Sequence, residues 1–445
     1  MIKNKTELSL KKLSVLGLQH VLAMYAGAVI VPLLVGNALG LTLDQLSFLV
    51  SADLFTCGIA TILQAKGIGN YAGVRLPVIM GCAFPAVAPM IVIGKNFGIL
   101  AIYGAVIGAG IFVFLIAPVF KKFLKFFPPL VIGLIIILIG LTLMPAAISN
   151  ILNQQNASNF GLLQNVCLAL GVIIFIVLAN KFLKGFLQTI SILLSLILGT
   201  LVAFFLGMVD PSNIGHAEWF RVIKPFYFGL PSFTLTGTLC MLLVALIAMV
   251  ESTGVFLTLG KICTQDVCHE RVVKGLRAEG IAQILGGIFN AFPYTTFSQN
   301  IGLVVLTKVT DNKVGISAGI ILILLGLIPK FGALATTIPS AVLGGAMIPM
   351  FGLVTAYGIK ILQTVDLKNT NNLLIIAITL GVGLGITINQ AQFEHAPEFI
   401  KTLFSNGIIV GGLIAIVLNA FFQRGNLSNL NLQYLEADNK VSEIL

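Results

Sequence analysis

Glu251 is the side chain in this sequence best suited to proton chemistry. It stands in the stretch LIAMVESTGVFLTLGK, directly after the apolar run 233–250, and no Lys or Arg lies at comparable depth to neutralise it. A carboxyl group among apolar residues is costly, so it indicates a function or a specific partner. We expect Glu251 to take up and release a proton. The alternative is a protonated carboxyl that only hydrogen-bonds a neighbouring helix.

Two further carboxylates, Glu279 and Asp53, also fall in apolar stretches. Glu279 lies in GLRAEGIAQILGG, nearer to one end of its expected helix, so an interfacial or helix-pairing role stays open beside a functional one. Asp53 lies one turn into its expected helix. We expect it to make a structural hydrogen bond.

Gln299 and Asn300 form a pair of adjacent amides in the stretch FPYTTFSQNIGLVVLTK. A side-chain amide offers donors and an acceptor in one plane, so it can bind the edge of a flat heterocycle that carries N–H and C=O side by side. We expect Gln299 to have this role. Asn300 either joins it or caps the helix that follows. Thr307 lies seven residues after Asn300, on the same face of that helix.

Three other patterns are weaker. His20 is a lone histidine in an apolar helix, which favours packing. The stretch CTQDVCH has the residue types of a metal site but no second ligand cluster, so we expect no metal ion. The stretch GAVIGAG lacks the preceding strand of a phosphate loop and indicates close helix packing instead.

The elements that must position these residues are membrane helices. The chain has 445 residues, of which 58% are hydrophobic and 9% charged, and its mean hydropathy is +1.04. A water-soluble globule cannot bury so many apolar residues. Apolar runs of about 20 residues recur along the chain, and such runs cross a bilayer as helices. The composition therefore predicts an all-α polytopic membrane protein.

The net charge of +10 reports orientation and does not require nucleic acid as a partner. With fourteen spans and a cytoplasmic N-terminus, 21 of the 26 Lys and Arg residues fall on the cytoplasmic side. This asymmetry is what the positive-inside rule demands, and both termini are then cytoplasmic. The exceptions are Lys95, Arg221, Lys224, Lys330 and Lys401.

Two of the fourteen expected spans are broken. The third contains Pro77, Gly81, Pro85 and Pro89, and the tenth follows Pro293; these residues interrupt a helix, so we expect a short extended piece in each. The spans are 14–35, 46–63, 78–93, 97–118, 128–146, 160–178, 187–207, 233–256, 274–290, 299–308, 314–329, 340–357, 371–388 and 404–422.

The broken spans are the third member of each set of seven, which predicts two repeats that enter the membrane in opposite orientation. Paired, interrupted segments of this kind indicate the binding site of a secondary transporter. We expect the extended pieces to leave backbone N–H and C=O groups unpaired in a common cavity, where a ligand can bind them.

At these residues the chain resembles the nucleobase and ascorbate transporter family, also called nucleobase:cation symporter 2, and within it the xanthine and uric acid permeases. QNIGLVVLTK fits the family signature of Gln or Glu, Asn, any residue, Gly, four residues, Thr and a basic or small residue. MVESTG places Glu251 on the family's substrate-binding glutamate. LGLQHVLAMYAGAVIVPLLVG and RLPVIMGCAFPAVAPM resemble the first and third spans.

The resemblance implies fourteen helices in two inverted seven-helix repeats, and a homodimer in the inner or plasma membrane. It divides the chain into a core domain, a gate domain and a cytoplasmic tail. The core comprises 1–126 and 231–338, the gate 127–230 and 339–424, and the tail 425–445.

The resemblance also implies site residues. Glu251 and Gln299 would bind the planar base, and Phe84, Ala83 and Ser298 would border it. Gln at the first signature position is typical of carriers of xanthine or uric acid, whereas uracil carriers more often have Glu. Proton coupling would involve Glu251, with support from the residues Glu279, Asn300, His20 and Thr307. Val255 replaces a polar residue of many members and alters the expected proton relay.

The sequence thus predicts a proton-coupled symporter that imports a purine nucleobase, in particular xanthine, without a cofactor. The alternatives are a uric acid or uracil carrier of the same family, or an anion transporter on the same fold. An enzyme is not expected, because the four histidines are scattered and neither H-E-x-x-H nor G-x-S-x-G occurs.

Overall fold

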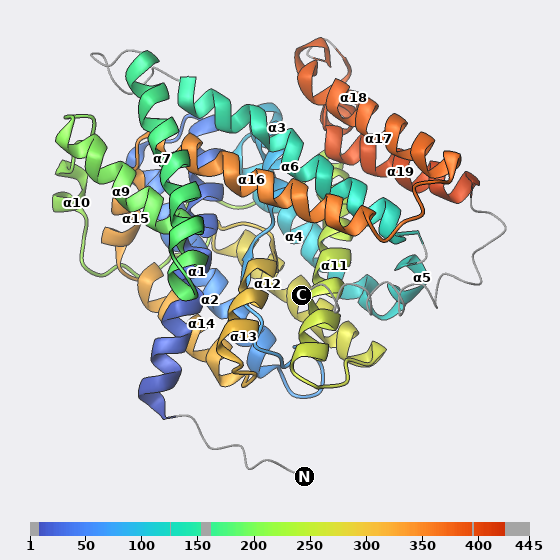
Figure 1. Cartoon of the computed structure of the whole chain (residues 1–445), viewed down its shortest axis with the longest axis horizontal. Coiled ribbons are helices and arrows are strands. Elements are labelled where there is room, and N and C mark those ends of the chain that lie inside the picture. Colours follow the sequence, from blue (N-terminus) through green and yellow to red (C-terminus); the bar gives the residue numbers. More distant parts are fainter. Residues whose placement is uncertain (1–8, 125, 153–161, 394–395, 423–445) are drawn as a thin grey trace.

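The computed structural model describes residues 9–124, 126–152, 162–393 and 396–422, and nearly all of its elements are helices (Figure 1). Within these residues, eight helices are long and apolar enough to cross a membrane. They are α1 (Leu10–Ala38), α2 (Leu43–Lys66), α4 (Ile99–Ile116, extended by a 3-10 turn), α6 (Pro129–Leu152), α7 (Leu162–Phe182), α11 (Leu235–Ile262), α16 (Ser340–Leu362) and α17 (Thr370–Ile388). The expected tail 425–445 lies outside the described residues.

The remaining expected spans coincide with shorter or more polar helices. These are α3 (Val87–Phe97), α9 (Ser191–Phe205), α12 (His269–Ile288), α13 (Ile301–Thr307), α14 (Lys313–Gly326), α15 (Pro329–Thr336) and α19 (Gly407–Phe422). Short helices α5 (Lys121–Leu124), α8 (Phe186–Thr189), α10 (Ser212–His216) and α18 (Glu398–Phe404) connect them.

The expected span 314–329 differs from the structure. Its helix α14 is followed after a short break by α15, and the two axes are bent by 77°. Ile328 has an extended backbone, with φ −108° and ψ 94°, and Pro329 begins α15. Proline excludes the helical conformation from the residue before it, which explains the bend.

The two broken spans are interrupted where their prolines and glycines predicted, and they also pair with each other. The strand β1 (Met80–Cys82) pairs antiparallel with β2 (Tyr294–Thr296), and Gly81 lies opposite Thr295. Each strand leads into a 3-10 turn, η1 (Phe84–Ala86) or η3 (Ser298–Asn300), and then into a half-helix, α3 or α13. The extended pieces predicted in these two segments are therefore confirmed.

The expectation that these strands leave their backbone unpaired is wrong. The ladder continues beyond the strands, because Ala83 N donates to Pro293 O and Phe297 N donates to Ile79 O. An unpaired backbone group away from water costs as much as a lost hydrogen bond, and the two strands avoid this cost by pairing. The backbone groups that form this ladder are therefore not free to bind a ligand.

Three helix pairs pack closely around this crossing: α2 with α14, α4 with α12, and α6 with α16. An added Cβ on Gly58 of α2 would lie 2.5 Å from Gly319 O of α14, and one on Gly110 of α4 would lie 2.8 Å from Gly280 O of α12. Such contact requires glycine, as is usual between membrane helices. Figure 1 shows α6 and α16 running side by side.

Candidate functional site

Glu251 is half-buried near the middle of α11 and lines a small pocket between α11 and α6. The ion pairs found among the described residues do not include it. The pocket has a volume of about 20 Å³, roughly that of a single water molecule. The other residues that line it are Phe127, Ile132, Ile135, Ile136, Ile139, Ile247 and Val250. Among the described residues that line the pocket, Glu251 is thus the single ionisable one.

Ser252, the next residue on α11, ties this helix to β2. Its hydroxyl oxygen lies 3.0 Å from Thr295 Oγ1, and it accepts a hydrogen bond of 3.2 Å from Thr296 N. Thr296 Oγ1 also donates to it over 3.2 Å. Ser252 is fully buried, so these bonds hold the helix that carries Glu251 against the strand that precedes Gln299.

Glu279 lies on α12 behind β2 and is fully buried. It is within electrostatic range of Glu251, and the Ser252 hydroxyl interacts with it, although neither carboxylate oxygen has a hydrogen bond of ordinary geometry among the described residues. One turn later, Gln283 Nε2 donates to Tyr294 O over 3.4 Å. The interior position argues against the interfacial interpretation of Glu279.

Ser298 and Gln299 are half-buried in the turn η3 directly after β2. Ser298 Oγ donates a weak hydrogen bond of 3.4 Å to Gln299 Oε1. Within the described part of the chain, the Gln299 amide nitrogen has no recorded hydrogen bond, so its two N–H donors can serve a ligand.

Asn300 is buried and does not cap the helix that follows. Neither η3 nor α13 has a side-chain cap, and Asn300 Nδ2 instead donates to His20 O over 3.2 Å. The capping interpretation of Asn300 is therefore wrong. Its side chain joins the tenth segment to α1.

Phe84 is the first residue of the buried turn η1, the place that Ser298 has in η3, and it follows the buried Ala83. Its ring packs edge-to-face on Phe351 of α16, with centroids 5.9 Å apart and planes at 84°. The Phe297 ring lies 6.3 Å from that of Phe84 and fits against Gly27 of α1, where an added Cβ would come within 2.7 Å of it. These rings make an apolar wall.

His20 and Thr307 have different surroundings. His20 is buried on α1, its backbone oxygen accepts from Asn300, and its Nδ1 has no partner among the described residues. Thr307 Oγ1 donates to Leu303 O over 2.7 Å at the end of α13, and it accepts from Val309 N. The Thr307 hydroxyl is thus bonded within its own segment. Val255 is buried and apolar.

Sequence reasoning did not assign Ser252, Phe297 or Phe351 to the site. A hydroxyl directly beside a buried carboxylate could have drawn attention to Ser252. Nothing local marks Phe351, because it reaches Phe84 only through the packing of α16 on the core.

A larger groove of about 830 Å³ lies between α6 and α17, away from these polar groups. Its lining is mostly aliphatic: Leu141, Met144, Pro145, Ile148, Ser149, Leu152, Leu384, Thr387 and Ile388. None of the described residues that line it is ionisable, and only the hydroxyls of Ser149 and Thr387 could hydrogen-bond a polar ligand.

A family model described as a permease family, Xan_ur_permease, matches residues 11–392 of this chain. The chain belongs to this permease family. The nucleobase transporter PlUacP of Paenibacillus larvae is 52% identical to the permease over 414 residues, which cover 93% of this chain and 95% of the relative. The resemblance inferred from the sequence is confirmed.

Two relatives in Bacillus subtilis are also similar to the permease. The xanthine permease is 49% identical over 92% of this chain and 93% of the relative. The uric acid permease PucJ is 49% identical over 96% of both chains. The family and these relatives make the chain a multi-pass membrane permease and not an enzyme.

Solved structures share the fold of the permease at low sequence identity. The transmembrane domain of the cyanobacterial bicarbonate transporter BicA superposes with a TM-score of 0.59 at 18% identity, over 94% of this chain and 99% of that one. SLC26A9 superposes with a TM-score of 0.55 at 11% identity, over 93% of this chain and 66% of that one. At such identities the likeness concerns the fold alone.

Proposed function

We propose that this permease imports a purine nucleobase, chiefly xanthine, together with protons. The observation that supports the proposal is the β1–β2 crossing, because Phe84 and Gln299 each follow one of the paired strands and Ser252 bonds the helix of Glu251 to β2. The relatives named for nucleobases, xanthine and uric acid support this substrate class.

Base recognition would divide between the two broken segments. The Gln299 amide presents two N–H donors and one oxygen in a plane, and the Glu251 carboxyl adds a donor or an acceptor according to its protonation. Ala83, Phe84 and Ser298 border the base, and the Phe84 ring supplies a flat apolar surface.

Proton coupling would centre on Glu251, with protons as the coupling ion and no cofactor. Protonated Glu251 donates to the base, and loss of the proton on the cytoplasmic side weakens the complex. Glu279 supports this step through its interaction with Ser252 and Glu251. Asn300 and His20 support it by fixing the tenth segment to α1. Thr307 lies at the far end of α13, where its hydroxyl stabilises the end of that helix.

Transport would require the gate to separate from the core. A pocket of about 20 Å³ cannot hold a purine, since ligand pockets usually measure ~300 Å³ or more. Movement of α6 away from α11 would open it. In this proposal the core is 1–126 with 231–338, and the gate is 127–230 with 339–424. The permease forms a homodimer in the inner or plasma membrane, with both termini cytoplasmic.

The close helix pairs support two inverted repeats within fourteen spans. In the expected order, α2 and α14 are the second and eleventh spans, and α4 and α12 are the fourth and ninth. A shift of seven spans converts the first pair into the second, and each pair has a glycine contact. The same shift exchanges β1 with β2, which pair with each other.

A purine fits this site better than an inorganic anion does. An anion site needs fixed positive charge, and the described residues place no cation within ion-pair distance of Glu251. Arg75 precedes β1 and donates to Gly69 O instead. Uric acid remains the nearest alternative to xanthine, because relatives named for either base are equally similar. Uracil is a more distant alternative.

The deciding experiment is uptake of labelled xanthine by cells that lack their own purine carriers. We expect saturable uptake that a proton uncoupler abolishes, and stronger competition by uric acid than by uracil. Uptake that resists the uncoupler would contradict proton coupling. Uptake of labelled bicarbonate without any uptake of xanthine would contradict the substrate class.

A further inference from the structure

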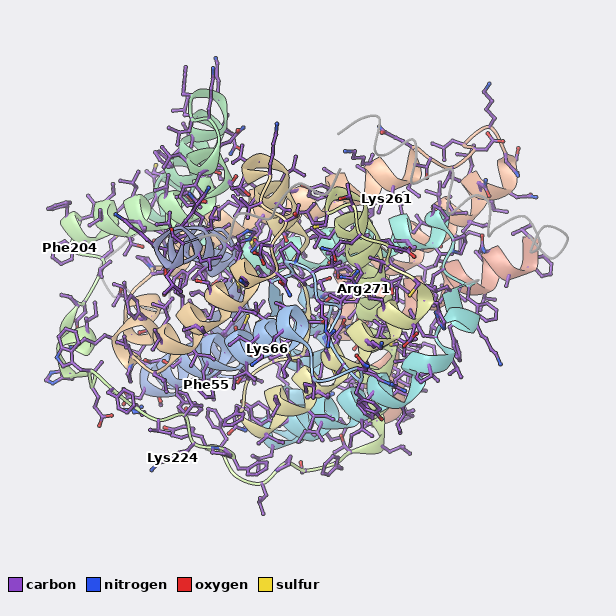
Figure 2. The ribbon with its side chains drawn as sticks, turned by 90° about the horizontal axis from the view of Figure 1, so that it is seen from below. Phe55, Lys66, Phe204, Lys224, Lys261 and Arg271 are labelled. Atoms are coloured by element: carbon purple, nitrogen blue, oxygen red, sulfur yellow. The ribbon has the colours of Figure 1, made fainter. Side chains whose placement is uncertain are left out.

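One face of α2 is polar although it is completely buried. Asp53, Cys57, Thr61 and Gln64 are spaced four, four and three residues apart, so they lie above one another on the same side of the helix. All four have no exposed surface. We call these four residues the α2 ladder. Figure 2 shows Phe55 and Lys66, which mark this helix, near the middle of the view.

The members of the α2 ladder bond to the chain around the first break. Gln64 Oε1 accepts from Val74 N over 3.1 Å, and Gln64 Nε2 donates to Gly275 O over 2.7 Å. Thr61 Oγ1 accepts from Met80 N over 3.1 Å, and the Cys57 thiol donates to Met80 O. Side chains of α2 therefore replace the helical partners that the broken segment lacks.

Asp53 is the only ionisable carboxylate of the α2 ladder, and it contacts both strands. Tyr294 Oη lies 2.9 Å from Asp53 Oδ1 and 3.1 Å from Asp53 O. The Cys82 thiol also interacts with the Asp53 carboxylate. Cys82 and Tyr294 are direct partners across the β1–β2 pair. The structural hydrogen bond predicted for Asp53 is thus confirmed, and its partner is the start of β2.

Contacts from two helices, α11 and α2, therefore hold the opposite ends of this short strand pair. Ser252 binds Thr295 and Thr296, close to Ser298 and Gln299. Asp53 binds the Cys82–Tyr294 end, directly before Ala83 and Phe84. A strand pair of this length is unstable alone, so its geometry depends on such contacts.

We propose that Asp53, acting through Tyr294, is a positioning residue for the base site. It fixes the Cys82–Tyr294 end of the strand pair and thereby sets where Phe84 lies relative to Gln299. Asp53 itself does not touch the base. The inference rests on the proposed function, because it assumes that the base lies between these two segments.

The test compares Tyr294→Phe, Asp53→Leu, Asp53→Asn and Gln64→Met in proteoliposomes. Tyr294→Phe removes a single hydroxyl and keeps the ring. Gln64→Met is the matched control, because it removes two buried hydrogen bonds from the same face of α2 without contacting β1 or β2. KM and Vmax for xanthine are measured per folded permease, together with amide exchange in 79–84 and 293–299.

We expect Tyr294→Phe and Asp53→Leu each to raise KM about tenfold with little change in Vmax. A double variant with both changes should raise KM no further, because the two residues form one interaction. Asp53→Asn should recover most of the affinity, because an amide oxygen still accepts from Tyr294. Amide exchange near β1 and β2 should accelerate in Tyr294→Phe. Gln64→Met should reduce the yield of folded protein without changing KM.

An unchanged KM in Tyr294→Phe, or an equal rise in Gln64→Met, would overturn the inference. If the wild type shows no purine uptake, the proposed function fails, and amide exchange alone then decides the positioning role. Faster exchange in Tyr294→Phe would support that role, and unchanged exchange would refute it.

Discussion

The two broken segments have the same backbone but different side chains. Each runs from a three-residue strand through a 3-10 turn into a half-helix, and the two strands pair antiparallel. After β1 come the apolar Ala83 and Phe84, whereas β2 is followed by Phe297 and then by the polar Ser298, Gln299 and Asn300. One segment thus offers a surface against which a flat molecule can pack, and the other offers hydrogen bonds that can distinguish its edge.

The segments also differ in how they are held. Gln64, Thr61 and Cys57 of α2 bond the first segment, whereas the second strand is held by Ser252 of α11 and by Asp53 of α2. The half-helix α3 has 11 residues, whereas α13 has 7 and ends at Lys308 in a left-handed conformation. The two segments therefore share the same succession of backbone elements but differ in the side chains that follow the strands and in the contacts that hold them. The following changes test that division.

The largest effect is expected for Glu251→Gln. The amide keeps the shape of the side chain but cannot take up and release a proton. Accumulation of xanthine should therefore fall by more than about tenfold, while exchange of internal for external base persists. The measurement is the accumulation ratio of labelled xanthine under a pH gradient. Glu218→Gln, at an exposed ion pair with Arg221, is the control. Undiminished accumulation in Glu251→Gln would refute the coupling role.

Phe84→Ala should weaken the binding of all bases to the same extent. The ring offers a surface and no hydrogen bond, so KM for xanthine and for uric acid should both rise about tenfold, with their ratio unchanged. Phe204→Ala, an exposed ring on α9 at the edge of the view in Figure 2, should leave both values alone. A selective loss of one base would show that the first segment also discriminates between bases.

Gln299→Glu should change the ranking of bases with little effect on folding. A carboxylate accepts hydrogen bonds where the amide nitrogen donates two. Inhibition by uracil should therefore strengthen several-fold relative to inhibition by uric acid, which corresponds to a change of ~1 kcal/mol in relative binding free energy. The measurement is inhibition of labelled xanthine uptake by each base. Gln188→Glu, at an exposed glutamine, is the control. An unchanged ranking would exclude Gln299 from base recognition.

The smallest effect is expected for Thr307→Val. The hydroxyl is bonded to Leu303 O inside its own helix, and such local bonds contribute little, so KM and Vmax should change by less than about twofold. A pH profile of uptake identical to that of the wild type would support this placement. A collapse of uptake in Thr307→Val would instead place Thr307 in the proton relay.

The sequence predicted the breaks because proline and glycine act locally, and it singled out Glu251 because a lone carboxylate in an apolar run is conspicuous. It could not predict that β1 and β2 pair with each other, since nothing near residue 80 specifies a partner near residue 295. The bond from Asn300 to His20 O was missed for the same reason. The bend at Pro329 could have been predicted from the sequence, because this proline lies at the end of an apolar run.

The most direct test is a structure of the permease determined with xanthine bound. The base should lie between the Glu251 carboxyl and the Gln299 amide, with its ring against Phe84 and with α6 displaced from α11. Xanthine bound in the groove between α6 and α17, or a Glu251 carboxyl and a Gln299 amide too far apart to contact one base, would contradict the account.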